Sequence, residues 1–170
     1  MNAEAYTLKR RLRICAAGTI AGLAGGFAEI AWIALYKNVS GGDAAAVARG
    51  VTETLFPSLV PEAAALPLGI AIHMCLAVTL GIAIAVFMRS LWPRAGSRAL
   101  EPVVVIGLLI CVWATNFFLV LPAMNPAFVT LVPYTASLAS KILFGGAAAL
   151  ALQLFDGPYP AQGRELKGAV

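Results

Sequence analysis

Four long apolar runs constrain the fold of this chain more than any other feature of its sequence. A helix needs about 20 residues to cross roughly 30 Å of hydrocarbon, and each run has that length. Hydrophobic residues make up 61% of the 170 positions and charged residues only 12%, which is too few polar groups to cover a soluble surface. The sequence therefore predicts an all-α integral membrane protein, a four-transmembrane-helix bundle, with spans at about 14–36, 66–88, 102–124 and 128–152.

The spans divide the chain into three parts: a basic N-terminus at 1–13, the membrane domain at 14–152 and a polar tail at 153–170. The tail is turn-rich, and we expect it to be disordered. Nine of the twelve Lys and Arg residues lie in the N-terminus, in the loop between the second and third spans, or in the tail, whereas two lie on the other side. Because basic loops stay inside, the sequence predicts a plasma or inner membrane protein with both termini cytoplasmic.

The loop at 37–65 is the only substantial segment expected outside the spans. Asp43 follows two glycines and is a typical helix cap. Apolar side chains then recur every fourth residue, at Val47, Val51 and Leu55. Arg49 and Glu53 are spaced to form a pair on another face. We expect a short amphipathic helix that lies on the outer membrane surface, crosses the mouth of the bundle, or is simply solvated.

Small residues recur at intervals of four, or multiples of four, in three of the spans. Such spacing allows helix backbones to approach closely in lipid, where the hydrophobic drive between helices is weak. We expect tight packing within one bundle, and a self-association surface on the first span is the alternative. The residues are Gly18, Gly22 and Gly26 in the first span, Gly69, Ala77 and Gly81 in the second, and Ser137, Gly145 and Ala149 in the fourth.

Four polar residues interrupt the spans: Glu29, His73, Asn116 and Lys141. A charge at mid-bilayer costs about 2.5–3.5 kcal/mol on insertion scales, so it needs a partner or a purpose. Glu29, His73 and Lys141 lie on the small-residue faces. At about 1.5 Å per residue, Glu29, His73 and Asn116 lie roughly 10 Å below the outer surface, and Lys141 lies nearer the middle with a flexible side chain that spans several ångströms. The sequence therefore predicts one intramembrane polar cluster in which Glu29 and Lys141 pair. A structural and a functional role for this cluster both remain open.

Other chemistry has little support in the sequence. We predict that Cys15, Cys75 and Cys111 are free thiols that act as small packing residues. A metal site of Glu29, His73 and Cys75 lacks a recognised ligand spacing. His73 is the only histidine, so one chain cannot supply two histidine ligands to a haem. We predict no metal and no cofactor.

The charge pattern and the packing faces together define the functional expectation. The basic clusters abut apolar runs and are not interleaved with exposed aromatics, so they suit lipid headgroups and not nucleic acid. We expect a non-enzymatic accessory or scaffold subunit whose partners are the lipid bilayer and either its own copies or other membrane subunits. One alternative is a small transporter or a proton or ion pathway that uses the polar cluster. A second alternative is a redox subunit that holds haem or quinone.

Overall fold

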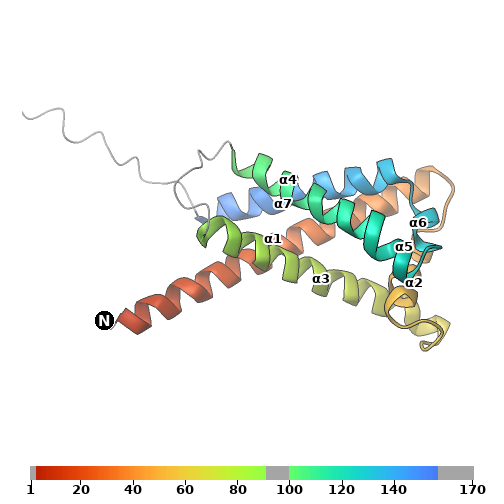
Figure 1. Ribbon diagram of the computed structural model, residues 1–170, viewed down its shortest axis with the longest axis horizontal. Helices are drawn as coiled ribbons and strands as arrows, with labels where there is room; N and C mark the ends of the chain where they lie inside the picture. Colours follow the sequence, from red (N-terminus) through yellow and green to blue (C-terminus); the bar gives the residue numbers. More distant parts are fainter. Residues whose placement is uncertain (1–2, 91–99, 157–170) are drawn as a thin grey trace, which may run out of the picture.

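The computed structural model describes residues 3–90 and 100–156 of the chain (Figure 1). Every regular element in these residues is helical. In order, the elements are α1 (Ala3–Val39), α2 (Ala44–Leu55), α3 (Glu62–Ser90), α4 (Glu101–Thr115), the π-helix η1 (Asn116–Val120), α5 (Leu121–Met124), α6 (Phe128–Leu131) and α7 (Tyr134–Asp156).

Four of the helical stretches are long and apolar enough to cross a membrane, which confirms the prediction of an all-α chain with four helices of that length and composition. They are Glu4–Val39, Glu62–Ser90, Glu101–Met124 and Tyr134–Asp156. The first exceeds its predicted span at both ends. At about 1.5 Å per residue, the 37 residues of α1 reach roughly 55 Å, and its N-terminal turns extend beyond the other helices (Figure 1).

The fourth long helix differs from the predicted span 128–152. Phe128–Leu131 forms a separate turn, α6, and the long helix begins only at Tyr134. Pro133 explains the break, because a proline lacks the N–H that would continue a helix and disfavours helical geometry in the preceding residue. The helix then continues to Asp156, four residues past the predicted end. The predicted disordered tail otherwise lies outside the described residues.

Helix α1 is the central element of the bundle. It packs against α3 on one side and α7 on the other, and α4 packs on the far side of α7. Helices α3 and α4 make few direct backbone contacts within the described residues, so they lie at the two ends of this arrangement. Side chains from all four helices still share one apolar core, which includes Ala21, Ala85, Leu109 and Phe144.

The α1–α3 contact is made by glycines. A Cβ atom placed on Gly22 would overlap the carbonyl oxygen of Ala77, and one on Gly81 would overlap the backbone of Gly18 and Gly22. A Cβ on Gly18 would lie 2.5 Å from Cα of Ile82. The small-residue face of α1 is therefore covered by α3 of the same chain, where only glycine allows the backbones to approach this closely.

The other predicted packing glycines serve different contacts. Gly145 of α7 lies against Ile106 and Leu109 of α4. Gly69 of α3 lies against the carbonyl of Ala48 in α2, and not against another long helix. Gly26 faces the side chains of Ala77 and Met74.

Helix α2 packs across one end of the bundle, against α3 and α6. As predicted, Asp43 caps it, accepting a hydrogen bond from the amide of Ala45 at 2.8 Å. Thr52 is buried and donates to the carbonyl of Ala65 in α3 at 2.6 Å. Val47 and Val51 pack against an aromatic cluster that includes Trp113, Phe117 and Phe128.

The predicted Arg49–Glu53 pair is wrong. Arg49 forms its ion pair with Asp43 instead, and Glu53 accepts a hydrogen bond from the backbone amide of Ser58 at 3.1 Å. The reason is local: the cap carboxylate of Asp43 is already held in place by the helix N-terminus, and the chain after α2 turns back within reach of Glu53.

The third long helical stretch contains the π-helix η1, in which the amide of Leu121 bonds to the carbonyl of Asn116, five residues earlier. Pro122 follows directly and accounts for the wider turn. Proline has no N–H to donate, and in a regular α-helix its ring would collide with the carbonyl of Phe118. The single wide turn keeps the stretch continuous from Glu101 to Met124.

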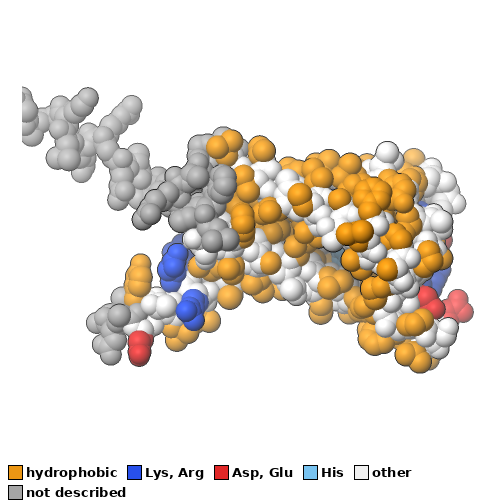
Figure 2. All heavy atoms as spheres, in the orientation of Figure 1, with side chains coloured by type: hydrophobic (Ala, Val, Ile, Leu, Met, Phe, Trp, Pro, Cys, Tyr) orange, Lys and Arg blue, Asp and Glu red, His pale blue; other side chains and the backbone are white. Residues whose placement is uncertain are grey.

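The surface is apolar along the helices and charged toward the ends. Figure 2 shows hydrophobic side chains over the length of the bundle, Lys and Arg near the start of α1, and acidic side chains near α2. All three cysteines are exposed on this surface, and none is in a disulfide. The prediction that they act as packing residues is therefore wrong, because each lies on the outward side of its helix.

Candidate functional site: the intramembrane polar cluster

Glu29 lies at the centre of the polar cluster. Its exposed fraction is only 8%, although it is a carboxylate inside an apolar bundle. Nζ of Lys141 lies 2.7 Å from each of its two carboxylate oxygens. The same ammonium lies 5.7 Å from the centroid of the Phe144 ring, at a distance that suits a cation–π contact. The two formal charges deep in the predicted spans therefore neutralise each other between α1 and α7.

Serine side chains extend this ion pair toward α4. Oγ of Ser140 lies 3.0 Å from Oε1 of Glu29 and 2.7 Å from the carbonyl of Ser137, and its one proton serves either acceptor. Oγ of Ser137 accepts a hydrogen bond from the indole of Trp113 at 3.0 Å. The cluster thus links α1, α7 and α4 through polar side chains.

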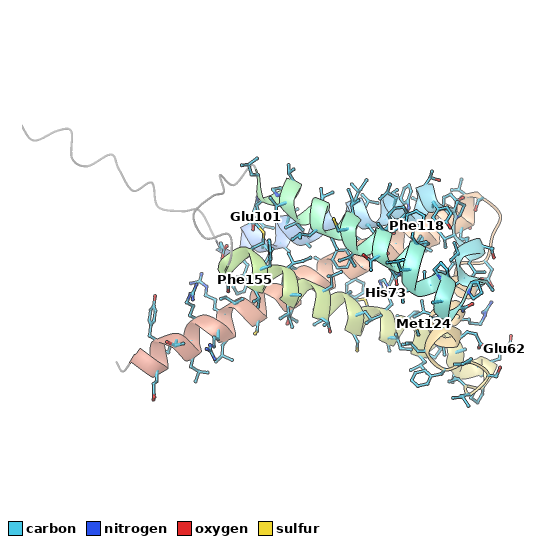
Figure 3. All side chains as sticks on the ribbon, in the orientation of Figure 1. Glu62, His73, Glu101, Phe118, Met124 and Phe155 are labelled. Atoms are coloured by element: carbon cyan, nitrogen blue, oxygen red, sulfur yellow. The ribbon has the colours of Figure 1, made fainter. Side chains whose placement is uncertain are left out.

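His73 lies on α3 (Figure 3), and its imidazole approaches the carboxylate of Glu29 on α1. Its Nε2 atom lies 3.9 Å from Oε2 of Glu29, which is too long for a hydrogen bond. That nitrogen is buried and has no hydrogen-bond partner among the residues that the structure describes. The imidazole as a whole is 23% exposed. His73 is therefore next to the ion pair but not bonded to it.

Asn116 is the one predicted cluster residue that these contacts do not include. It is half-buried at the first position of η1, and its side chain forms neither of the hydrogen bonds that Glu29 accepts from Ser140 and Lys141. Its backbone carbonyl instead closes the wide turn before Pro122.

Sequence reasoning missed the contribution of Ser140, Ser137 and Trp113 to this cluster. A usable signal was present. Lys141 follows Ser140 directly, and Ser137 lies one helical turn before it, so the three side chains share one side of α7. An indole N–H in an apolar helix also needs an acceptor, which Trp113 finds on Ser137 and Trp32 finds on the carbonyl of Ala136 at 2.9 Å.

A further ion pair joins two of the long helices at the opposite end of the bundle from α2. Arg89 at the end of α3 donates to Oδ1 of Asp156 at the end of α7 at 2.7 Å, and its other terminal nitrogen lies 2.5 Å from Oδ2. The guanidinium of Arg13 lies 5.9 Å from the ring centroid of Phe155. Arg89 is one of the basic residues between the second and third predicted spans, and its side chain joins the ends of α3 and α7.

No group of three or more His, Cys, Asp or Glu side chains comes together within 3–90 and 100–156. Cys75 lies on the exposed side of α3, apart from the contacts of Glu29 and His73.

Comparison with known protein families, with curated proteins and with solved structures finds no match for this chain.

Proposed function

We propose that this chain is a multi-pass membrane protein that acts as a non-enzymatic accessory or scaffold subunit of a membrane assembly. The four long helices would cross the membrane, both termini would be cytoplasmic, and α2 would cover the outer end of the bundle. The observation that carries this proposal is the closed Glu29–Lys141 pair: the two charges bind each other at 2.7 Å.

A closed ion pair favours a scaffold over an open pathway for two physical reasons. Each charge has a partner within the chain, so neither needs a transported ion to offset the cost of burial. The contacts also join α1 to α7 directly, and through Ser137 and Trp113 they reach α4. Polar contacts of this kind hold helices in one arrangement in lipid, which a scaffold needs.

Membrane orientation is tested with single cysteines in a background where Cys15, Cys75 and Cys111 are replaced by alanine. All three are exposed, so their removal leaves no internal cavity. A cysteine at Ser40, beside α2, should react with an impermeant reagent on intact cells, whereas one at Glu4, in the first turn of α1, should react only after lysis. Labelling of both positions, or of Glu4 alone, on intact cells would refute the proposed orientation.

The scaffold role is tested by purifying the tagged chain from native membranes in a mild detergent and measuring the mass of the intact assembly. We expect a stoichiometric complex with copies of the chain or with other membrane subunits. A matched variant that carries Leu119→Lys, on the most exposed part of η1, reports on whether that face is an interface. A chain that is monomeric at native expression level and binds no protein would reject the scaffold role.

The transport alternative is favoured by one observation, the unpartnered Nε2 atom of His73 beside the ion pair. The test is whether liposomes that contain the chain dissipate an imposed proton gradient faster than liposomes that contain Glu29→Gln. A difference between the two would favour transport, and equal leakage at the level of empty liposomes would count against it.

A further inference from the structure

We propose that the cluster of His73, Glu29 and Lys141 is a reversible proton-binding site in which His73 takes up the proton and then binds Glu29. The inference does not depend on the accessory role, since it concerns the chemistry of the cluster within a single chain. The bound ligand is a proton from water, so the net charge of the three side chains changes from zero to +1.

The first argument is the distance between His73 and Glu29. At 3.9 Å between Nε2 and Oε2, a direct hydrogen bond is absent. A bridging water with two ordinary hydrogen bonds requires a separation of about 4.5 Å, so the gap is also too narrow for a water on the direct line. A shift of roughly 1 Å in a side chain would bring the two atoms to the normal distance for a charge-assisted bond.

The second argument is the unsatisfied state of Nε2. A buried polar atom without a partner is costly, and Nε2 is such an atom in this structure. Protonation gives the imidazole an N–H on both ring nitrogens and places a positive charge next to a carboxylate. The protonated form therefore gains the interaction with Glu29 that the neutral form lacks.

The third argument is competition for one carboxylate. Two charged groups lie beside the imidazole: the carboxylate of Glu29 on α1, with Oε2 3.9 Å from Nε2, attracts a positive charge on the ring, and the ammonium of Lys141 on α7, bound to the same carboxylate, repels one. The charged residues of α2 are engaged elsewhere, Arg49 by Asp43 and Glu53 by Ser58. The stretch from α4 to α5 carries one charged residue, Glu101, at its far end.

Proton uptake would therefore redistribute the contacts of α1. Glu29 would bind His73 on α3 as well as Lys141 on α7, and two cations would share its two oxygens. The α1–α3 contact gains an ion pair, while the ammonium of Lys141 gives up one of its two close carboxylate contacts. The cluster then couples pH to the balance between two helix contacts.

Proton binding by His73 can be measured without overlap from other histidines, because His73 is the only histidine in the chain. The ring nitrogens of histidine labelled with ¹⁵N give one assigned set of signals, which is followed in bicelles from pH 4 to pH 9. The amide spectrum of the same sample reports on folding. Wild type should titrate reversibly in one step, with the Nε2 shift of a hydrogen-bonded imidazolium at low pH.

Three variants test whether Glu29 and Lys141 control proton binding by His73. Lys141→Met removes the competing cation, so the midpoint should move up by about one pH unit or more, a tenfold change in proton binding. Glu29→Gln removes the anion, so the midpoint should move down by a similar amount. Ser140→Ala, which also loses a contact to Glu29 but carries no charge, should change it by less than about 0.3 unit.

The proposal is overturned if wild type does not titrate between pH 4 and pH 9, or if Lys141→Met has the midpoint of wild type. Should Glu29→Gln fail to fold, Glu29→Asp replaces it. The shorter side chain keeps the negative charge but withdraws it from His73, and the midpoint should again move down. An unchanged midpoint in Glu29→Asp would also contradict the proposal.

Discussion

Helix α1 binds its two neighbours by opposite means. Toward α3 it presents glycines, and the backbones meet with almost no side chain between them. Toward α7 it presents long polar side chains: Glu29 reaches Lys141 and Ser140, and Trp32 reaches the carbonyl of Ala136. The same helix therefore uses the absence of side chains on one face and specific polar groups on the other.

The difference between these two contacts shows how one helix can select two different neighbours although the hydrophobic drive between helices is weak in lipid. The glycine contact gains dispersion energy over many atoms and is sensitive to shape. The polar contact is concentrated in a few hydrogen bonds and is sensitive to charge. Glu29 lies where the two faces meet, with His73 of α3 and Lys141 of α7 on either side, so it is the residue through which the contacts are linked.

The largest expected effect is the loss of one charge from the α1–α7 contact. Lys141→Met alone leaves the Glu29 carboxylate buried without its cation and should cost about 3–5 kcal/mol. Glu29→Gln alone should cost a similar amount. The double variant should be more stable than either single variant, because no unpaired charge remains.

A double-mutant cycle of unfolding free energies in bicelles measures this, and we expect a coupling of at least about 3 kcal/mol, because the double variant should cost less than either single variant. Additive effects, with a coupling below about 0.5 kcal/mol, would show that the polar face of α1 does not act through this pair.

The glycine face should respond to shape and not to charge. Gly22→Ala adds one methyl group that overlaps the carbonyl oxygen of Ala77 and forces α1 and α3 apart, at a cost of about 1–3 kcal/mol. Thermal unfolding in detergent measures the loss. The matched control is Gly146→Ala, where the added Cβ has open space around it. Equal stability of both variants would mean that close approach of α1 and α3 is not needed.

The loss of a single neutral hydrogen bond on the polar face of α1 should lower the free energy of unfolding by less than either of these changes. Trp32→Phe keeps an aromatic ring but removes the N–H that donates to the carbonyl of Ala136 at 2.9 Å. We expect a loss of about 1 kcal/mol in unfolding free energy. Phe27→Leu, on the exposed side of the same helix, serves as the control and should stay within about 0.5 kcal/mol of wild type.

The smallest effect concerns α2, which lies outside both faces of α1. The amide of Ala45 and then the guanidinium of Arg49 hold the pKa of Asp43 below its usual value of 3.8. A carboxyl with a lowered pKa stabilises the fold above its unfolded pKa, and this contribution is lost as the pH falls through the folded pKa. The side chain of Asp43 is exposed to solvent, which weakens its interactions, so the effect should be small.

The measurement is the difference in thermal unfolding between wild type and Asp43→Asn at several values of pH. Asparagine is also a good helix cap, so only the charge differs. We expect wild type to be slightly more stable near pH 7 and the advantage to disappear below about pH 3.8. A difference that persists unchanged at pH 2.5 would contradict this origin.

Several features could be read from the sequence because they depend on local order. The number of long apolar helices follows from run lengths, and the cap at Asp43 follows from the residue types around it. The Glu29–Lys141 contact was predictable because two opposite charges in apolar helices have few other partners. The glycines could be identified as packing residues from their spacing, because an interval of four residues places them on one face of a helix.

Which neighbour each of those faces meets was decided only by the tertiary structure. Spacing along one helix cannot say that Gly22 faces Ala77 of α3 while Gly69 faces Ala48 of α2, because that depends on where the chain turns between helices. The same applies to His73, whose Nε2 stops 3.9 Å short of Glu29. A helical pattern fixes direction and depth to within several ångströms, but whether two polar atoms bond is decided by differences of about 1 Å, which only the packed backbones determine.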